Sequence, residues 1–190
     1  SNPSQIISIL WIRLQNFLRG RYRNVQSHYD TGDDLFNTFL DDHMTYSCGY
    51  RKSSEDSLEQ LQINKFDRIC QKLQLKEGDT LLDIGCGYGG MLIHAVQNYG
   101  VKGTGITISK HHCKLAQERV KELGLSDSLR IEYSSHKEFV GTYDKIVSIG
   151  MMEHLTRPDY KIYAQNISGA LNENGIGLIP VSYTQLTPDT

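Results

Sequence analysis

The chain has 190 residues, the usual size of one domain and enough to bury a hydrophobic core. A net charge of −2 gives no general attraction to nucleic acid, and no stretch reaches the roughly 18–20 apolar residues of a membrane span. The four cysteines show neither a C-x-x-C pair nor a zinc-like spacing, so we expect reduced thiols in a cytoplasmic protein and no metal site.

The N-terminal stretch is basic and amphipathic. Apolar residues recur at three- and four-residue spacing between Ile6 and Leu18, and residues 1–29 contain no Asp or Glu. The basic residues of this stretch are Arg13, Arg19, Arg21 and Arg23. The pattern predicts a helix that either packs on its own domain or lies on an anionic membrane.

Residues 28–50 are unusually rich in aromatic side chains, histidine and hydroxyl groups. Asp33 or Asp34 can cap a short helix over 35–40. The loop-like part, residues 44–50, is either a packed aromatic cluster or a lid over a ligand pocket.

A helix is predicted to follow, because Ser57 and Gln60 stand at capping-box spacing. Its expected buried face consists of Leu58, Leu61, Phe66, Ile69 and Leu73.

The central motif begins with an apolar, β-favouring run from Thr80 to Asp83. A glycine-rich turn follows, and then a helical pattern that stops near Gly100. Strand, glycine loop and helix in this order place a ligand at the carboxyl end of the first strand of a parallel sheet.

Two kinds of cofactor suit such a loop. Gly85, Gly87 and Gly90 satisfy the G-x-G-x-x-G pattern of dinucleotide-binding proteins. That interpretation also requires an acidic residue about 20 positions later, whereas the next strand ends in Thr107, Ile108 and Ser109. The other interpretation starts from the acidic residue that precedes the glycines.

The remaining chain alternates between strand-like and helix-like segments. Strands are expected near 103–107, 129–133, 144–150 and 176–179, and helices over 109–123, 136–139 and 160–171. The alternation predicts an α/β fold with a mostly parallel sheet of five strands.

Glu153 and His154 leave the expected fourth strand, next to the point where the strand order reverses. They form a candidate acid–base pair, although a surface Glu and His after a strand explain the pattern equally well.

Two resemblances favour the second cofactor. Asp83 and the glycines form Asp-x-Gly-x-Gly-x-Gly, which resembles motif I of the class I S-adenosylmethionine (SAM) methyltransferases. Residues 24–179 resemble the cyclopropane-fatty-acyl-phospholipid synthases and mycolic acid cyclopropane synthases. These resemblances imply a Rossmann-like sheet of five strands in the order 3-2-1-4-5, with an N-terminal helical lid. The matching blocks are 28–30 (His-Tyr-Asp), 44–50 (Met-Thr-Tyr-Ser-Cys-Gly-Tyr), 82–89, 105–109 and 148–154.

The resemblance implies methyl transfer from SAM to the double bond of an unsaturated phospholipid acyl chain, followed by proton removal and ring closure. In the family the base is a bound bicarbonate, and the matching catalytic groups here are Cys48, the Ile149 backbone and Glu153, with His154 beside them. Asp83 is expected to order the loop. The residues expected around SAM are Tyr46, Ser47, Asp83, Gly85, Cys86, Gly87, Gly89, Thr107, Ile108, His112 and His136.

The chain departs from the family at three places. His112 stands where the family usually has Gln, His136-Lys137 replaces an aromatic and charged pair near the adenine, and Pro180 replaces an anion-site His. We therefore divide the chain into a basic helix and lid segment (1–57), a SAM-binding α/β core (58–179) and an atypical tail (180–190), and expect truncation near Ile179.

Alternatives remain open at this point. A small-molecule amine N-methyltransferase and a SAM-binding fragment without turnover both fit the same motifs. The expected partner is a phospholipid membrane surface, on which the protein would be peripheral, with no nucleic acid and with a homo-oligomer left open.

Overall fold

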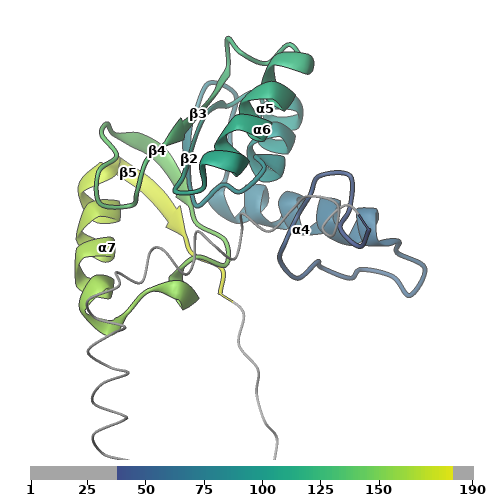
Figure 1. Ribbon diagram of the computed structural model, residues 1–190, viewed down its shortest axis with the longest axis horizontal. Coiled ribbons are helices and arrows are strands. Elements are labelled where there is room, and N and C mark those ends of the chain that lie inside the picture. The colour runs from purple at the N-terminus through teal and green to yellow at the C-terminus, as the bar shows by residue number, and fades with distance from the viewer. Residues whose placement is uncertain (1–37, 182–190) are drawn as a thin grey trace, which may run out of the picture. The chain divides into compact units, whose positions relative to one another are not determined.

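In the computed structural model, residues 38–181 are described (Figure 1). The predicted basic helix, the 28–30 motif, residues 35–37 of the short predicted helix and residues 182–190 lie outside the described residues. Residues 38–40, the described part of that short helix, form a turn and a bend instead. The described residues all belong to one compact unit.

A five-stranded parallel sheet forms the centre of this unit, in the order β3-β2-β1-β4-β5. This confirms the predicted fold class and strand order. The strands are β1 (Thr80–Ile84), β2 (Lys102–Thr107), β3 (Leu129–Tyr133), β4 (Tyr143–Val147) and β5 (Leu171–Leu178). Because β1 pairs with both β2 and β4, its carboxyl end lies where the strand order reverses.

Within residues 38–181, four α-helices connect or precede the strands: α4 (Leu58–Leu73), α5 (Gly90–Tyr99), α6 (Lys110–Glu122) and α7 (Arg157–Ala170). Their ends follow local sequence signals. The Ser57 hydroxyl accepts the Gln60 backbone N–H, and the Ser109 hydroxyl accepts that of His112, as expected of N-caps. Gly100 ends α5 in the left-handed conformation, φ 66°.

Two hydrophobic cores lie on the two faces of the sheet. One contains Leu81 and Val147 with side chains of α4, α5 and α6, and the other contains Leu82 and Ile146 with side chains of α7. Figure 1 shows α7 on one side of the strands and α5 and α6 on the other. Since side chains alternate along a strand, Asp83 shares the face of Leu81, towards α4 and α5.

The predicted buried face of α4 is partly wrong. Leu58 is 45% exposed, whereas Gln62, Asn64 and Lys65 are buried. The reason is tertiary: the segment before the helix covers these polar side chains, and a helical periodicity cannot show which loop will return to the helix surface.

Two other expectations also differ from the structure. Residues 136–138 form a turn rather than the predicted short helix. The fourth strand ends at Val147, before the predicted Gly150, and β5 begins at Leu171 with an irregular pairing against β4 rather than after Gly175.

No helix within residues 38–181 is long and apolar enough to cross a membrane. All four cysteines lie in this range and are free thiols, as expected from their spacing.

Close packing between the sheet and its helices predicts the effect of adding a methyl group to Gly105. A Cβ there would lie 2.8 Å from Cys86 Sγ, Ile131 Cδ1 and Leu92 Cδ1. We expect Gly105→Ala to lower the free energy of unfolding by about 1–3 kcal/mol, measured by urea denaturation. A matched control is Gly169→Ala in α7, where a Cβ would meet nothing within 4 Å. Equal stability of the two variants would contradict this packing.

Candidate cofactor site at the end of strand β1

The loop after β1 turns back sharply, because Gly85 and Gly87 have φ values of 85° and 55°. The loop is held to the neighbouring strand by its backbone: the N–H groups of Gly85 and Cys86 both donate to Ile106 O, at 2.9 and 3.0 Å. Gly89, φ 81°, then leads into α5. The glycines are therefore required by backbone conformation, as the motif predicts.

The loop leaves room beside it for a ligand. A Cβ at Gly87 would meet nothing within 4 Å, so the backbone can be approached closely there. Cys86 points the other way: its buried thiol packs beside Gly105, so only its backbone can face a ligand. Burial raises the pKa of this thiol well above its usual value.

Asp83 lies at the base of the loop and is 2% exposed. Its Oδ1 atom has no hydrogen-bond partner among the described residues. Burial raises the pKa of the carboxyl to about 7, while the positive charge of Lys65 opposes this shift. A buried acceptor without a donor is costly, so Asp83 is suited to bind a donor on a ligand.

The loop after β4 lies against the glycine loop, as predicted from the strand order. Ser148, fully buried, donates its hydroxyl to Ile84 O at 2.7 Å, and Met151 Cγ lies 3.1 Å from the Cβ position of Gly85. Glu153 and His154 are exposed and belong to the short 3₁₀ helix η1 (Met152–His154).

The segment 38–50 packs on α4. The Tyr50 N–H donates to Leu61 O at 2.8 Å, and Gln62 Nε2 donates to Ser47 O at 2.9 Å. Lys65 Nζ donates to Ser47 Oγ at 2.7 Å. These bonds are compatible with the predicted lid. The structure leaves two predicted site residues, Tyr46 and Cys48, exposed.

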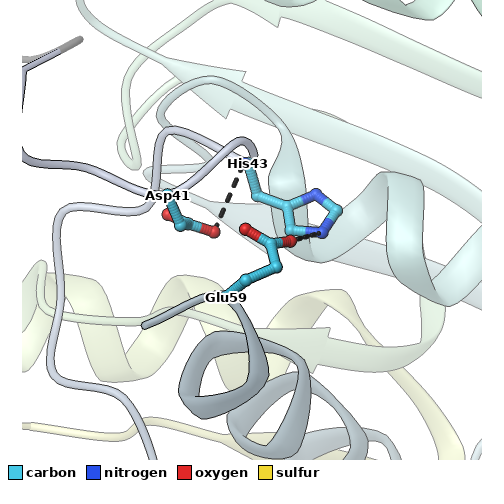
Figure 2. Close-up of side chains that lie close together, drawn as sticks. All are labelled: Asp41, His43 and Glu59. Atoms are coloured by element: carbon cyan, nitrogen blue, oxygen red, sulfur yellow. Dashed lines mark hydrogen bonds and ion pairs between the residues drawn. The ribbon is translucent and has the colours of Figure 1, made fainter. Parts of the chain in front are cut away.

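Figure 2 shows a second group of polar side chains, Asp41 and His43 of this segment and Glu59 of α4. Their nearest ligand-type atoms lie within 4.8 Å of one another. The atoms that could bind a metal ion already have protein partners. Asp41 accepts hydrogen bonds from the N–H groups of His43 and Thr45, and His43 Nε2 lies 2.9 Å from Glu59 Oε1. We interpret these contacts as structural: they hold the 38–50 segment on α4.

The other predicted cofactor residues lie at the end of β2 or follow β2 and β3. Thr107 and His112 are buried, and Ile108 is half-buried. The His112 ring lies 4.2 Å from that of Tyr88 in the glycine loop. His136 is buried against Tyr163, with ring centroids 5.8 Å apart.

Three residues of this site were not predicted as functional: Lys65, Tyr88 and Ser148. Tyr88 and Ser148 stood inside recognised motifs, but their contacts with His112 and Ile84 join different elements. Lys65 had one weak signal, a charged residue on the apolar side of a predicted helix.

A parallel sheet in the order 3-2-1-4-5, with an acidic residue and a glycine loop at the end of its first strand, is the arrangement of class I SAM-dependent methyltransferases. The fold and the site define this class.

The chain belongs to the mycolic acid cyclopropane synthetase family, whose model matches residues 17–189. This match includes most of residues 180–190, the segment set apart above as atypical.

Individual relatives agree with this assignment. The chain is 42% identical over 154 residues to a cyclopropane-fatty-acyl-phospholipid synthase of Escherichia coli, covering 81% of this chain and 39% of that protein. It is 37% identical over 162 residues to cyclopropane mycolic acid synthase 1 of Mycobacterium tuberculosis, covering 85% and 56%.

A crystal structure of mycolic acid cyclopropane synthase CmaA1, complexed with SAH and CTAB, superposes with a TM-score of 0.81 at 37% identity. The superposition covers 84% of this chain and 56% of that one. The chain thus spans between two fifths and three fifths of the length of these relatives.

The contact between segment 38–50 and α4 yields a prediction at Gly49. A Cβ there would lie 2.6 Å from Leu61 Cβ and 3.2 Å from Leu61 C, atoms that cannot move without the helix. We expect Gly49→Ala to displace the segment and to speed hydrogen exchange of the Tyr50 amide about tenfold or more, because its bond to Leu61 O is weakened. Gly169→Ala is again the control, and unchanged exchange in Gly49→Ala would argue against a segment docked on α4.

Proposed function

We propose that the protein is a SAM-dependent methyltransferase that adds a methylene or methyl group to the double bond of an unsaturated phospholipid acyl chain. The observation that carries the proposal is the glycine loop at the end of β1, which combines open space at Gly87 with the unpartnered Asp83 Oδ1. Membership of the cyclopropane synthetase family supports this chemistry over that of a nicotinamide dinucleotide.

SAM fits the residues present. Its amino-acid end carries an ammonium group, the donor that Asp83 Oδ1 lacks, and the loop backbone at Gly85 and Gly87 can approach the ligand without side chains in the way. On the other side, Tyr46 and Ser47 would contact it from the 38–50 segment. Thr107, Ile108, His112 and His136 would contact it beyond β2 and β3.

Bound SAM would supply an electrophilic methyl group. An alkene is a weak nucleophile, so the protein must hold the acyl chain in line with that methyl and exclude water. In this proposal the segment 38–50, docked on α4, excludes water on one side of the site.

A base must then remove a proton, and by family membership we propose bicarbonate held by Cys48, the Ile149 backbone and Glu153. Within residues 38–181 these groups form no buried anion pocket: Cys48 and Glu153 are exposed and Ile149 is half-buried. Glu153 is the residue by which a role in proton transfer is tested.

Two features support a phospholipid as substrate. The Escherichia coli relative is a cyclopropane-fatty-acyl-phospholipid synthase, and the N-terminal sequence is basic and amphipathic. The Mycobacterium tuberculosis relative is a cyclopropane mycolic acid synthase, which makes a mycolic acid the alternative substrate within the same chemistry.

The experiment follows labelled methyl groups. SAM is first titrated into the protein by calorimetry, with NADH as the control, and we expect saturable binding of SAM alone. Methyl-labelled SAM is then offered with vesicles of unsaturated phospholipid and, separately, with a soluble amine. Label in the acyl chain supports the proposal, and label in the amine supports an amine N-methyltransferase. Binding without transfer supports a SAM-binding protein without turnover.

The variant Glu153→Gln tests whether Glu153 acts in proton transfer. If Glu153 acts in proton transfer, turnover should fall by about 100-fold or more while SAM affinity stays within about twofold. A large loss of SAM binding would show that its role is in holding the cofactor instead.

A membrane surface as partner is a further part of the proposal, and it depends on the four N-terminal arginines. A basic residue near an anionic surface contributes about 1 kcal/mol, so replacing all four by Gln should weaken vesicle binding at least about tenfold. The vesicles contain phosphatidylserine, and binding is measured by sedimentation. The matched control replaces four exposed basic residues of the core, Lys102, Lys114, Lys121 and Arg130. Equal losses in the two variants would show only a general charge effect.

A further inference from the structure

Lys65 is a buried lysine on α4 whose hydrogen bonds go to neutral groups. It is 8% exposed, and its Nζ donates to Ser47 Oγ at 2.7 Å and to Gln62 Oε1 at 2.6 Å. A buried ammonium is costly unless an opposite charge compensates it. Burial accordingly lowers the pKa of Lys65 to about 8, and neighbouring acidic groups oppose this shift.

Asp83 supplies an opposite charge on the same face of the sheet. The alternation along β1 points its side chain towards α4, and the charges of Lys65 and Asp83 stabilise each other. Other titratable groups that interact with one member of this pair come from the 38–50 segment, the glycine loop and α7: Asp41, Cys48, Cys86 and Tyr163.

The same lysine also holds the predicted lid. Gln62 Nε2 donates to Ser47 O while Gln62 Oε1 accepts from Lys65, so Ser47 is fixed through both its carbonyl and its hydroxyl. One ammonium therefore connects α4, the 38–50 segment and, through charge, the end of β1.

We propose that Lys65 is a positioning residue of the cofactor site, which fixes Ser47 and keeps Asp83 ionised so that Asp83 Oδ1 can accept a hydrogen bond from the ammonium of a SAM-like ligand. The proposal rests on the proposed function for the identity of the ligand. Asp83 would touch the ligand, and Lys65 would act through Asp83 and Ser47.

The sign of the pH effect follows from the two groups. The pKa of Asp83 is raised to about 7, so the carboxylate that a cationic ligand needs is present above this pH and is lost below it. Without the lysine charge, the pKa of Asp83 rises further, and the pH range in which binding is strong moves upward.

The test measures the dissociation constant of S-adenosylhomocysteine by calorimetry from pH 6 to pH 9. This probe keeps the ammonium group and is chemically stable over the range. Comparing each variant with the wild type at the same pH cancels the titration of the ligand's own amine. Wild-type affinity should rise as the pH increases through about 7.

Lys65→Met should weaken binding about tenfold or more at pH 7 and much less at pH 9, since one pKa unit corresponds to a tenfold change. Ser47→Ala should weaken binding without moving the pH dependence. Asp83→Asn should abolish the rise near pH 7, and adding Lys65→Met to it should then have little further effect. The control is Lys72→Met, an exposed lysine of the same helix.

The outcomes separate the two proposals. Lys65→Met with wild-type affinity and an unchanged pH profile would overturn the role of Lys65 and leave SAM binding intact. A flat wild-type profile between pH 6 and pH 8 would overturn it as well, even if Lys65→Met does not fold. Absence of binding to folded wild-type protein would overturn both this role and the proposed function.

Discussion

The site depends on the position of the carboxyl end of β1 between two parallel neighbours. On one side, the N–H groups of Gly85 and Cys86 share Ile106 O on β2, and on the other the Ser148 hydroxyl binds Ile84 O. These bonds fix the turn that the glycines make possible, and they bring the loops after β2 and β4 to its two sides. Because the strand order reverses at β1, the helices that follow β1 and β4 pack on opposite faces of the sheet, the arrangement that places ligands at this edge in such folds.

A second feature of the site is that α4 buries polar groups instead of a purely apolar face. Gln62 and Lys65 are buried because the 38–50 segment lies on them, and each hydrogen-bonds to Ser47. Burying an ammonium and a carboxylate rarely improves stability over an apolar core. The two buried charges of Lys65 and Asp83, and the unpartnered Asp83 Oδ1, are therefore better explained by a ligand than by folding. For this reason they support the proposed cofactor end of the site more directly than the exposed Glu153 does.

Family membership and geometry contribute different parts of the functional conclusion. The family match and the superposition on CmaA1 establish which group of proteins the chain belongs to. The geometry of Asp83, the glycine loop and Lys65 supports binding of a cationic ligand without reference to any relative. The proposed acyl substrate rests on the relatives and on the N-terminal sequence, and the proposed proton-accepting group rests on Cys48 and Glu153, both of which are exposed.

The amino-acid sequence alone determined the parallel sheet, the cap at Ser57, the end of α5 at Gly100 and the glycine loop, because each depends on local conformation or on alternation along the chain. The strand order was predicted from the resemblance to class I methyltransferases, and the structure confirms it. The sequence could not determine that Leu58 is exposed and Lys65 buried, since burial on α4 depends on a segment that returns to the helix from outside it. Only the tertiary structure decided this. The physical reason is that hydrophobic periodicity shows only that a helix has an apolar and a polar face. Which neighbour covers a polar side chain depends on packing between distant parts of the chain.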